Sequence, residues 1–203
     1  MSEPIQESHV LARGFGDPVH DAQSCFRILL DALSRPGTQH TFQVELDVEA
    51  RRRWPAAALA SLLTLCDHST PIWFQKPDAS LEDTIGFHAN AVATNDVKQA
   101  SFAYVTDGTD MPAPDSYASG TPTEPENSCT VFIRVDAFAG GRRLNMTGPG
   151  IEHSVQIAPV GVDETFWQLR ADSPVQAPLG IDCYLVCGET IVGIPRTTRV
   201  ELI

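Results

Sequence analysis

The chain has 203 residues, 42% of them hydrophobic, and a formal net charge of −12. That length and apolar content suit one globular domain with a buried core, and the acidic balance argues against nucleic acid and anionic membranes as partners. The first residues are polar and acidic rather than a signal peptide, no apolar run is long enough to span a membrane, and the five cysteines lack disulfide-like spacing. We therefore expect a cytoplasmic protein with reduced thiols.

The first predicted helix follows a short polar segment. Asp17 has the character of an N-cap, Pro18 suits the first helical position, and apolar residues recur at helical spacing to about Leu33. Residues 1–15 are predicted to form an N-terminal arm, and residues 16–203 a single α/β domain.

Later elements are predicted from hydrophobic periodicity and from Gly and Pro punctuation. A second helix begins at Pro55 and a short one at Asp163, whereas residues 78–98 are ambiguous and fit a helix followed by a loop. The predicted strands are 42–48, 70–74, 101–106, 129–135, 142–146, 154–158, 181–187 and 191–194. Two of them flank Gly140-Gly141 and are expected to form a hairpin, and the proline-rich residues 107–128 are expected to form a long surface loop. Strands alternate with helices, so the predicted fold is α/β with a mixed central β-sheet flanked by helices.

One carboxylate interrupts the most apolar strand. Residues 181–187 are continuously apolar apart from Asp182, which predicts a strand buried on both faces. A buried carboxylate needs a partner, and Arg196 or Arg199 could supply it. A structural ion pair is the favoured interpretation, and a functional carboxylate is the alternative, because perturbed carboxylates cluster at functional sites.

A basic segment follows the last predicted strand. The guanidinium groups of Arg196 and Arg199 could bind an anion through paired N–H donors, or the segment could lie against an acidic subunit. The candidate ligand-binding or partner-binding residues are Asp182, Arg196, Thr197, Thr198 and Arg199. The six histidines have no zinc-site spacing, so no metal is expected, and no catalytic residue is assigned. Gly148-Pro149-Gly150 fits a tight turn better than a phosphate-binding loop, because no Gly-Lys-Ser/Thr sequence follows it.

Five phrases of the sequence, in their order and spacing, carry a family resemblance. They are residues 26–37, 63–73, 148–151, 178–182 and 195–198. Together they resemble the H subunit of carbon–phosphorus lyase over roughly residues 15–200. Residues 87–91 depart from that family, where a His-Thr-Gly phrase is expected.

The resemblance implies a role in phosphonate catabolism. The family works with other carbon–phosphorus lyase subunits that attach methylphosphonate to the ribose of ATP and release adenine, and the chemistry is credited to those subunits. It also implies a homodimer and a fold like that of pyridoxal-phosphate-dependent transferases without their active site. A nucleotide or a phosphonate is the ligand that this role suggests. Five aromatic residues near element ends could anchor an interface: Trp54, Trp73, Phe74, Phe87 and Phe102.

Two hypotheses of different class follow. The first is an accessory, non-catalytic subunit. No cofactor is expected for it, because the only lysines, Lys76 and Lys98, lie in polar segments that are unsuited to the Schiff base that pyridoxal phosphate forms. The second is a free-standing hydrolase or transferase that acts on a small anionic substrate through Asp182 and a nearby histidine.

Overall fold

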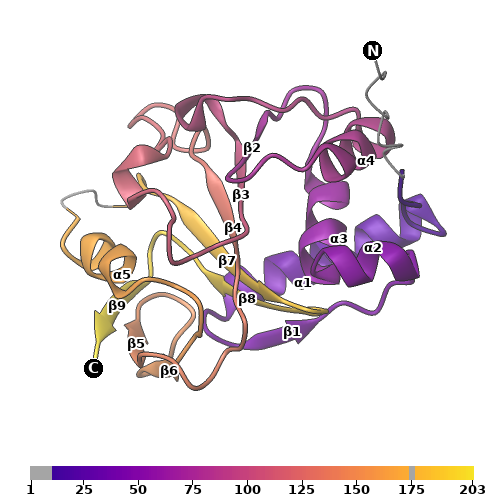
Figure 1. Cartoon of the computed structure of the whole chain (residues 1–203). Coiled ribbons are helices and arrows are strands. Elements are labelled where there is room, and N and C mark those ends of the chain that lie inside the picture. Colours follow the sequence, from indigo (N-terminus) through magenta and orange to yellow (C-terminus); the bar gives the residue numbers. More distant parts are fainter. Residues whose placement is uncertain (1–10, 174–176) are drawn as a thin grey trace, which may run out of the picture.

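A six-stranded mixed sheet forms the centre of the computed structural model, which describes residues 11–173 and 177–203 (Figure 1). Its strand order is β1-β8-β7-β4-β3-β2. The strands are β1 (Gln39–Thr41), β2 (Ile72–Phe74), β3 (Phe102–Val105), β4 (Thr130–Arg134), β7 (Asp182–Cys187) and β8 (Thr190–Ile194). Strands β2, β3, β4 and β7 are parallel, whereas β8 runs antiparallel to both of its neighbours. The predicted α/β class with a mixed sheet is confirmed.

Different elements cover the two faces of this sheet (Figure 1). One face carries the helices α1 (Pro18–Ser34), α2 (Val48–Arg53), α3 (Ala56–Leu65) and α4 (Ala79–Ala89). The other face carries α5 (Glu164–Ala171) and a small antiparallel sheet of order β6-β5-β9, made of β5 (Leu144–Thr147), β6 (Val155–Ile157) and β9 (Arg199–Leu202). Single 3-10 turns occur at Val97–Gln99 and Pro114–Ser116. No helix among the described residues combines the length and apolarity that crossing a membrane requires.

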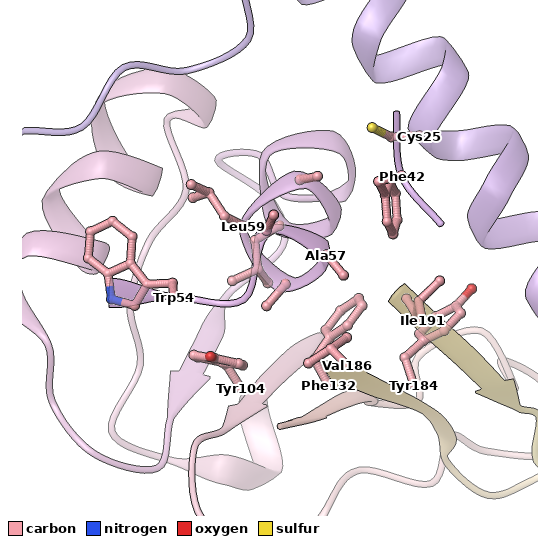
Figure 2. Close-up of a cluster of buried hydrophobic side chains, with 14 of the residues drawn as sticks. Cys25, Phe42, Trp54, Ala57, Leu59, Tyr104, Phe132, Tyr184, Val186 and Ile191 are labelled. Carbon is pink, nitrogen blue, oxygen red and sulfur yellow. The ribbon is translucent and has the colours of Figure 1, made fainter. Parts of the chain in front are cut away.

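The alternation of side chains along the central strands creates two hydrophobic cores. Tyr104, Phe132 and Tyr184 face the helical layer, where the last two rings stack at 5.2 Å between centroids (Figure 2). The Tyr184 hydroxyl donates a hydrogen bond to the Leu29 carbonyl of α1 over 2.9 Å, so this buried polar group is satisfied. The intervening residues of β4 and β7 face the second core, which includes Trp167 of α5.

Several local predictions are confirmed. The Asp17 side chain caps α1 by accepting a hydrogen bond from the His20 backbone N–H at 3.1 Å, and Pro18 occupies the first helical position. Strand β7 lies in the sheet interior between β4 and β8. Asp163 caps α5, and the ambiguous segment 78–98 contains α4, capped by Asp78. All five cysteines are free thiols.

The predicted hairpin around Gly140-Gly141 is wrong. Strand β4 lies between β3 and β7 in the central sheet, whereas β5 pairs with β6 and β9 in the small sheet. The reason is burial on both faces: Val131, Phe132 and Ile133 are all fully buried, which suits an interior parallel strand rather than one arm of a surface hairpin.

The predicted strand over residues 42–48 is also wrong. The paired strand is Gln39–Thr41, and Phe42 makes the last backbone hydrogen bond, to the carbonyl of Glu189. Phe42 and Leu46 are buried as the alternation requires, but no neighbouring strand pairs with the backbone beyond this point. Strand β9 was not predicted, because it pairs with β5, a segment more than fifty residues earlier in the chain.

The described part of the predicted N-terminal arm packs on α4. The Ala12 backbone N–H donates to Thr84 Oγ1 at 3.2 Å, and the Ala12 carbonyl lies 2.9 Å from His88 Nε2. Residues 1–10 of that arm lie outside the described residues.

Candidate ligand-binding site

A four-residue link carries the chain from the central sheet to the small sheet. Strand β8 ends at Ile194, β9 begins at Arg199, and the turn between them closes with a hydrogen bond from the Thr198 N–H to the Pro195 carbonyl at 2.9 Å. This link places Arg196 beside Asp182, the first residue of β7. The site therefore lies at the amino end of the parallel strands, whereas open α/β sheets usually bind ligands at the carboxyl ends.

Asp182 and Arg196 form a largely buried ion pair, as the apolar context of Asp182 predicted. Arg196 Nη2 lies 2.5 Å from Asp182 Oδ2, and the Arg196 backbone N–H donates to Oδ1 at 2.7 Å. Only 17% of the arginine side chain and 14% of the aspartate side chain are exposed. Arg196 Nη1 also donates to the carbonyls of Pro125 and Pro178 at 2.8 and 3.2 Å. Both charged groups are engaged within the protein, so the pair acts as a brace.

Arg170, in the last turn of α5, was not predicted as a site residue. Its Nη1 donates to the Ile181 carbonyl at 3.0 Å, and its Nη2 to the Pro195 carbonyl at 2.9 Å. Among the described residues no carboxylate lies within ion-pair distance of this guanidinium, and its Nε is buried without a hydrogen-bond partner. Burial raises the pKa of the neighbouring Cys183 thiol to about 11, although Arg170 opposes that shift, so Cys183 is neutral and supplies no counter-charge.

Two cavities adjoin each other at this place. Their volumes are about 70 and 560 Å³, and both are lined by Arg170, Ser173, Arg196 and Thr198. The larger cavity is also lined by Pro149, Thr197, Arg199 and Glu201. Helix α5 lies beside β9 at this end of the molecule (Figure 1).

The structure brings the candidate residues of the sequence together in different environments. Arg196, Thr197, Thr198 and Arg199 all line the larger cavity, whereas Asp182 reaches it only through its pair with Arg196. Thr197 and Arg199 are exposed, but Thr198 is buried, and its Oγ1 has no hydrogen-bond partner. Arg170 could not be found from the sequence, because only the tertiary fold places α5 against the link after β8.

The Gly148-Pro149-Gly150 segment forms a tight turn against the same link. Gly148 has φ 139°, and a Cβ at this position would lie 2.9 Å from the Thr197 carbonyl oxygen. Gly150 has φ 82°, and a Cβ there would lie 2.3 Å from the Ser34 carbonyl oxygen at the end of α1. Three of the segments that carry the family resemblance, residues 26–37, 148–151 and 195–198, thus lie against one another. The two glycines permit this close approach of the backbones.

Histidines and metal-ligand clusters play no part in this site. No histidine lines either cavity, and the hydrogen bonds to the Asp182 carboxylate come from Arg196. Within residues 11–173 and 177–203, no group of three His, Cys, Asp or Glu side chains is arranged to hold a metal ion. His9 lies outside the described part of the chain.

Neither lysine is placed to hold pyridoxal phosphate. Lys76 pairs with Asp107 at 2.9 Å with 59% of its side chain exposed, and the Lys98 amine donates to the backbone carbonyls of Asp115 and Tyr117. A Schiff-base lysine requires a desolvated, nucleophilic amine. Protein purified and then incubated with pyridoxal phosphate is expected to show no internal-aldimine absorbance band. A band that disappears in Lys76→Ala or Lys98→Ala would contradict this expectation.

The fold and the site together define a class: an α/β protein with an arginine-lined cleft and no catalytic constellation of the usual kinds among its described residues. The chain belongs to the PhnH family, described as "Bacterial phosphonate metabolism protein (PhnH)", whose family model matches residues 13–201. Its relatives include "Alpha-D-ribose 1-methylphosphonate 5-triphosphate synthase subunit PhnH" of Rhizobium meliloti (strain 1021), 36% identical over 197 residues, which cover 96% of this chain and 98% of the relative. A second relative, "Putative C-P lyase subunit protein HtxG" of Stutzerimonas stutzeri, is 39% identical over 83 residues, which cover 41% of this chain and 43% of the relative. The family resemblance of the sequence phrases is confirmed.

Proposed function

We propose that this chain is an accessory, non-catalytic subunit of the carbon–phosphorus lyase core complex in phosphonate catabolism. In that role it supports transfer of methylphosphonate to the ribose of ATP with release of adenine, which yields ribose 1-methylphosphonate 5-triphosphate. The observation that carries the proposal is the match over 96% of the chain to a relative named as a subunit of the synthase for that product.

The geometry of the site supports an accessory role. A general acid or base must have a free proton-transfer group within hydrogen-bond reach of the substrate. The Asp182 carboxylate is instead held by the backbone N–H and the guanidinium of Arg196, and no histidine lines the cavities. The alternative, a free-standing hydrolase or transferase using Asp182 and a nearby histidine, has no supporting contact here.

Exposed apolar side chains support assembly with other subunits and a homodimer. On α1, Val19, Phe26 and Leu30 are 76%, 45% and 53% exposed, and Phe87 at the end of α4 is 71% exposed. Large apolar side chains that are exposed to solvent are typical of surfaces that contact other proteins. Trp54, expected as an interface anchor, is instead buried, and its Nε1 donates to Asp78 Oδ2 at 2.8 Å.

Two further features belong to the same proposal and rest on the family resemblance. One is a fold related to that of pyridoxal-phosphate-dependent transferases without their active site, with which the parallel strands β2, β3, β4 and β7 are compatible. The other is a cytoplasmic location, consistent with five free cysteines.

Activity measurements with and without partner subunits test the proposal. The isolated chain, incubated with ATP and methylphosphonate, is expected to release no adenine, whereas the complex co-expressed with its partner subunits does. Omitting this chain from the co-expression is expected to lower adenine release. Light scattering is expected to give twice the 22.0 kDa chain mass. Adenine release by the isolated chain would favour the free-standing enzyme, and a monomer mass at micromolar concentration would count against the dimer.

A further inference from the structure

We propose that the larger cavity binds the terminal phosphate-type oxyanion of a small organic ligand, held by Arg199 and Thr198 in the positive field of Arg170. All three residues line this cavity. The ligand class is a phosphate ester or a phosphonate, both of which present a tetrahedral PO₃ group to a binding site. Binding by the chain itself goes beyond the proposed accessory role and does not depend on it.

The balance of charge in the cavity is the first argument. Three arginines and one carboxylate, that of Glu201, line it in a protein whose net charge is −12. Arg196 is neutralised by Asp182. Arg170 and Arg199 have no carboxylate partner among the described residues, and the nearby Asp172 accepts a hydrogen bond from Gln168 instead. A concave site lined by one excess sign of charge attracts ligands of the opposite sign.

Fixed positive charge makes Arg170 a positioning residue for an anion. Its Nη atoms are held by the backbone carbonyl of Ile181, just before β7, and by that of Pro195, at the start of the link between the sheets, so the guanidinium cannot turn away to solvent. Carbonyl oxygens satisfy its N–H donors but do not cancel its charge. An oxyanion in the cavity would neutralise this charge without any rearrangement of Arg170, and such preorganisation favours binding.

Unpaired donors at the same place are the second, independent argument. Thr198 is only 5% exposed, and its Oγ1 has no partner in the described structure, nor has the buried Arg170 Nε. A buried polar atom without a hydrogen bond is unfavourable, and most such atoms in proteins are paired. A ligand oxygen that accepts from Thr198 Oγ1 would satisfy this hydroxyl, while the exposed Arg199 guanidinium closes over a second oxygen.

The size of the cavity indicates what accompanies the oxyanion. Its volume of about 560 Å³ falls within the range of sites for complete small organic ligands. A carboxylate among the lining residues, Glu201, can accept a hydrogen bond from a hydroxyl or amino group of the ligand. Both observations favour a phosphorylated organic molecule, such as a nucleotide, over inorganic phosphate.

Calorimetric titration of the full-length chain tests the proposal. The probes are ATP, methylphosphonate and inorganic phosphate, each at the same low ionic strength, because exposed charge interactions are screened by salt. Saturable one-site binding is expected, with ATP bound about tenfold or more tightly than phosphate, since the cavity accommodates an organic body. Equal affinity for all three would identify the free oxyanion as the ligand and overturn the organic-ligand part. No saturable binding by any probe up to about 10 mM, well above a weak millimolar Kd, overturns the whole inference.

Three variants make the test specific. Arg199→Gln and Thr198→Val are each expected to weaken ATP binding about tenfold. The matched control is Arg27→Gln, the same change of charge at an exposed position of α1 on the opposite layer. The Thr198→Val protein is expected to melt no lower than wild type, because the lost hydroxyl has no partner.

Two outcomes contradict this assignment. If Arg27→Gln weakens binding as much as Arg199→Gln, the effect is one of overall charge. If Thr198→Val binds ATP as wild type does, the buried hydroxyl is not a ligand-binding group. Either result would leave the proposed accessory role untouched, because assembly with partner subunits is measured separately.

Discussion

The Arg196→Ala variant is expected to lose about 3–5 kcal/mol of unfolding free energy, the range for removing one partner of a buried ion pair. The substitution leaves the Asp182 carboxylate, 14% exposed, with only the backbone N–H of residue 196 as a donor from that side. It also removes the donor to the carbonyls of Pro125 and Pro178. The arginine ties three segments together, so its loss affects each of them.

Urea unfolding followed by fluorescence measures this change, and a matched surface pair controls it. Arg35, just after α1, pairs with Asp31 in the last turn of that helix at 2.6 Å, but both side chains are more than half exposed. Arg35→Ala is therefore expected to cost no more than about 0.5 kcal/mol. If Arg196→Ala loses less than about 1 kcal/mol of unfolding free energy, solvent or other donors replace the guanidinium. The interpretation of the Asp182–Arg196 pair as a structural brace would then be wrong.

Gly150→Ala is expected to destabilise the protein by about 2–4 kcal/mol, from backbone strain together with overpacking. The residue has φ 82°, a conformation that L-amino acids rarely adopt, and the new methyl group would lie 2.3 Å from the Ser34 carbonyl oxygen. Both contacting groups are backbone or ring atoms, of Ser34 and Pro36, which cannot swing aside as a flexible side chain can.

Thermal and urea unfolding of Gly150→Ala are best compared with those of Gly16→Ala. A Cβ at Gly16 would meet nothing within 4 Å, so a change within about 0.5 kcal/mol is expected there. Because Pro149 lines the larger cavity, Gly150→Ala is also expected to weaken ligand binding there. Equal stability of the two alanine variants would show that the turn can relax. The stability of the protein would then not depend on the close contact between residues 148–151 and the end of α1.

Short-range sequence patterns, such as capping residues and apolar runs, account for the parts of the fold that were predicted. The cap at Asp17 and the apolar run 181–187 depend on neighbouring residues, so they could be recognised without knowledge of distant segments. The Asp182–Arg196 pair was also within reach, because a carboxylate in an apolar strand demands a partner and few cations follow it. These are features that the chain specifies over short stretches.

Strand pairing over long distances accounts for the parts that were not predicted. Gly140-Gly141 has the sequence of a hairpin turn, but strand β4 before it is buried on both faces and lies between β3 and β7. Arg170 lies on a helix with no unusual local pattern, and it joins the site only because α5 packs beside β9. Neither outcome is encoded within a window of ten or twenty residues.

Strand β1 has consequences for the time course of synthesis, because its partner comes so late in the chain. Thr41 on β1 lies beside Thr190 on β8, 149 positions later. A ribosome that adds 5–20 residues per second needs roughly 7–30 s to cover that distance. During this interval, α1 and β1 have emerged without β8, the strand with which β1 pairs, and the cavity-lining residues 196–201 have not yet been made. Chaperones therefore have a defined interval in which to act on the nascent chain, and a ribosome that stalls before β8 leaves a product whose first strand has no partner.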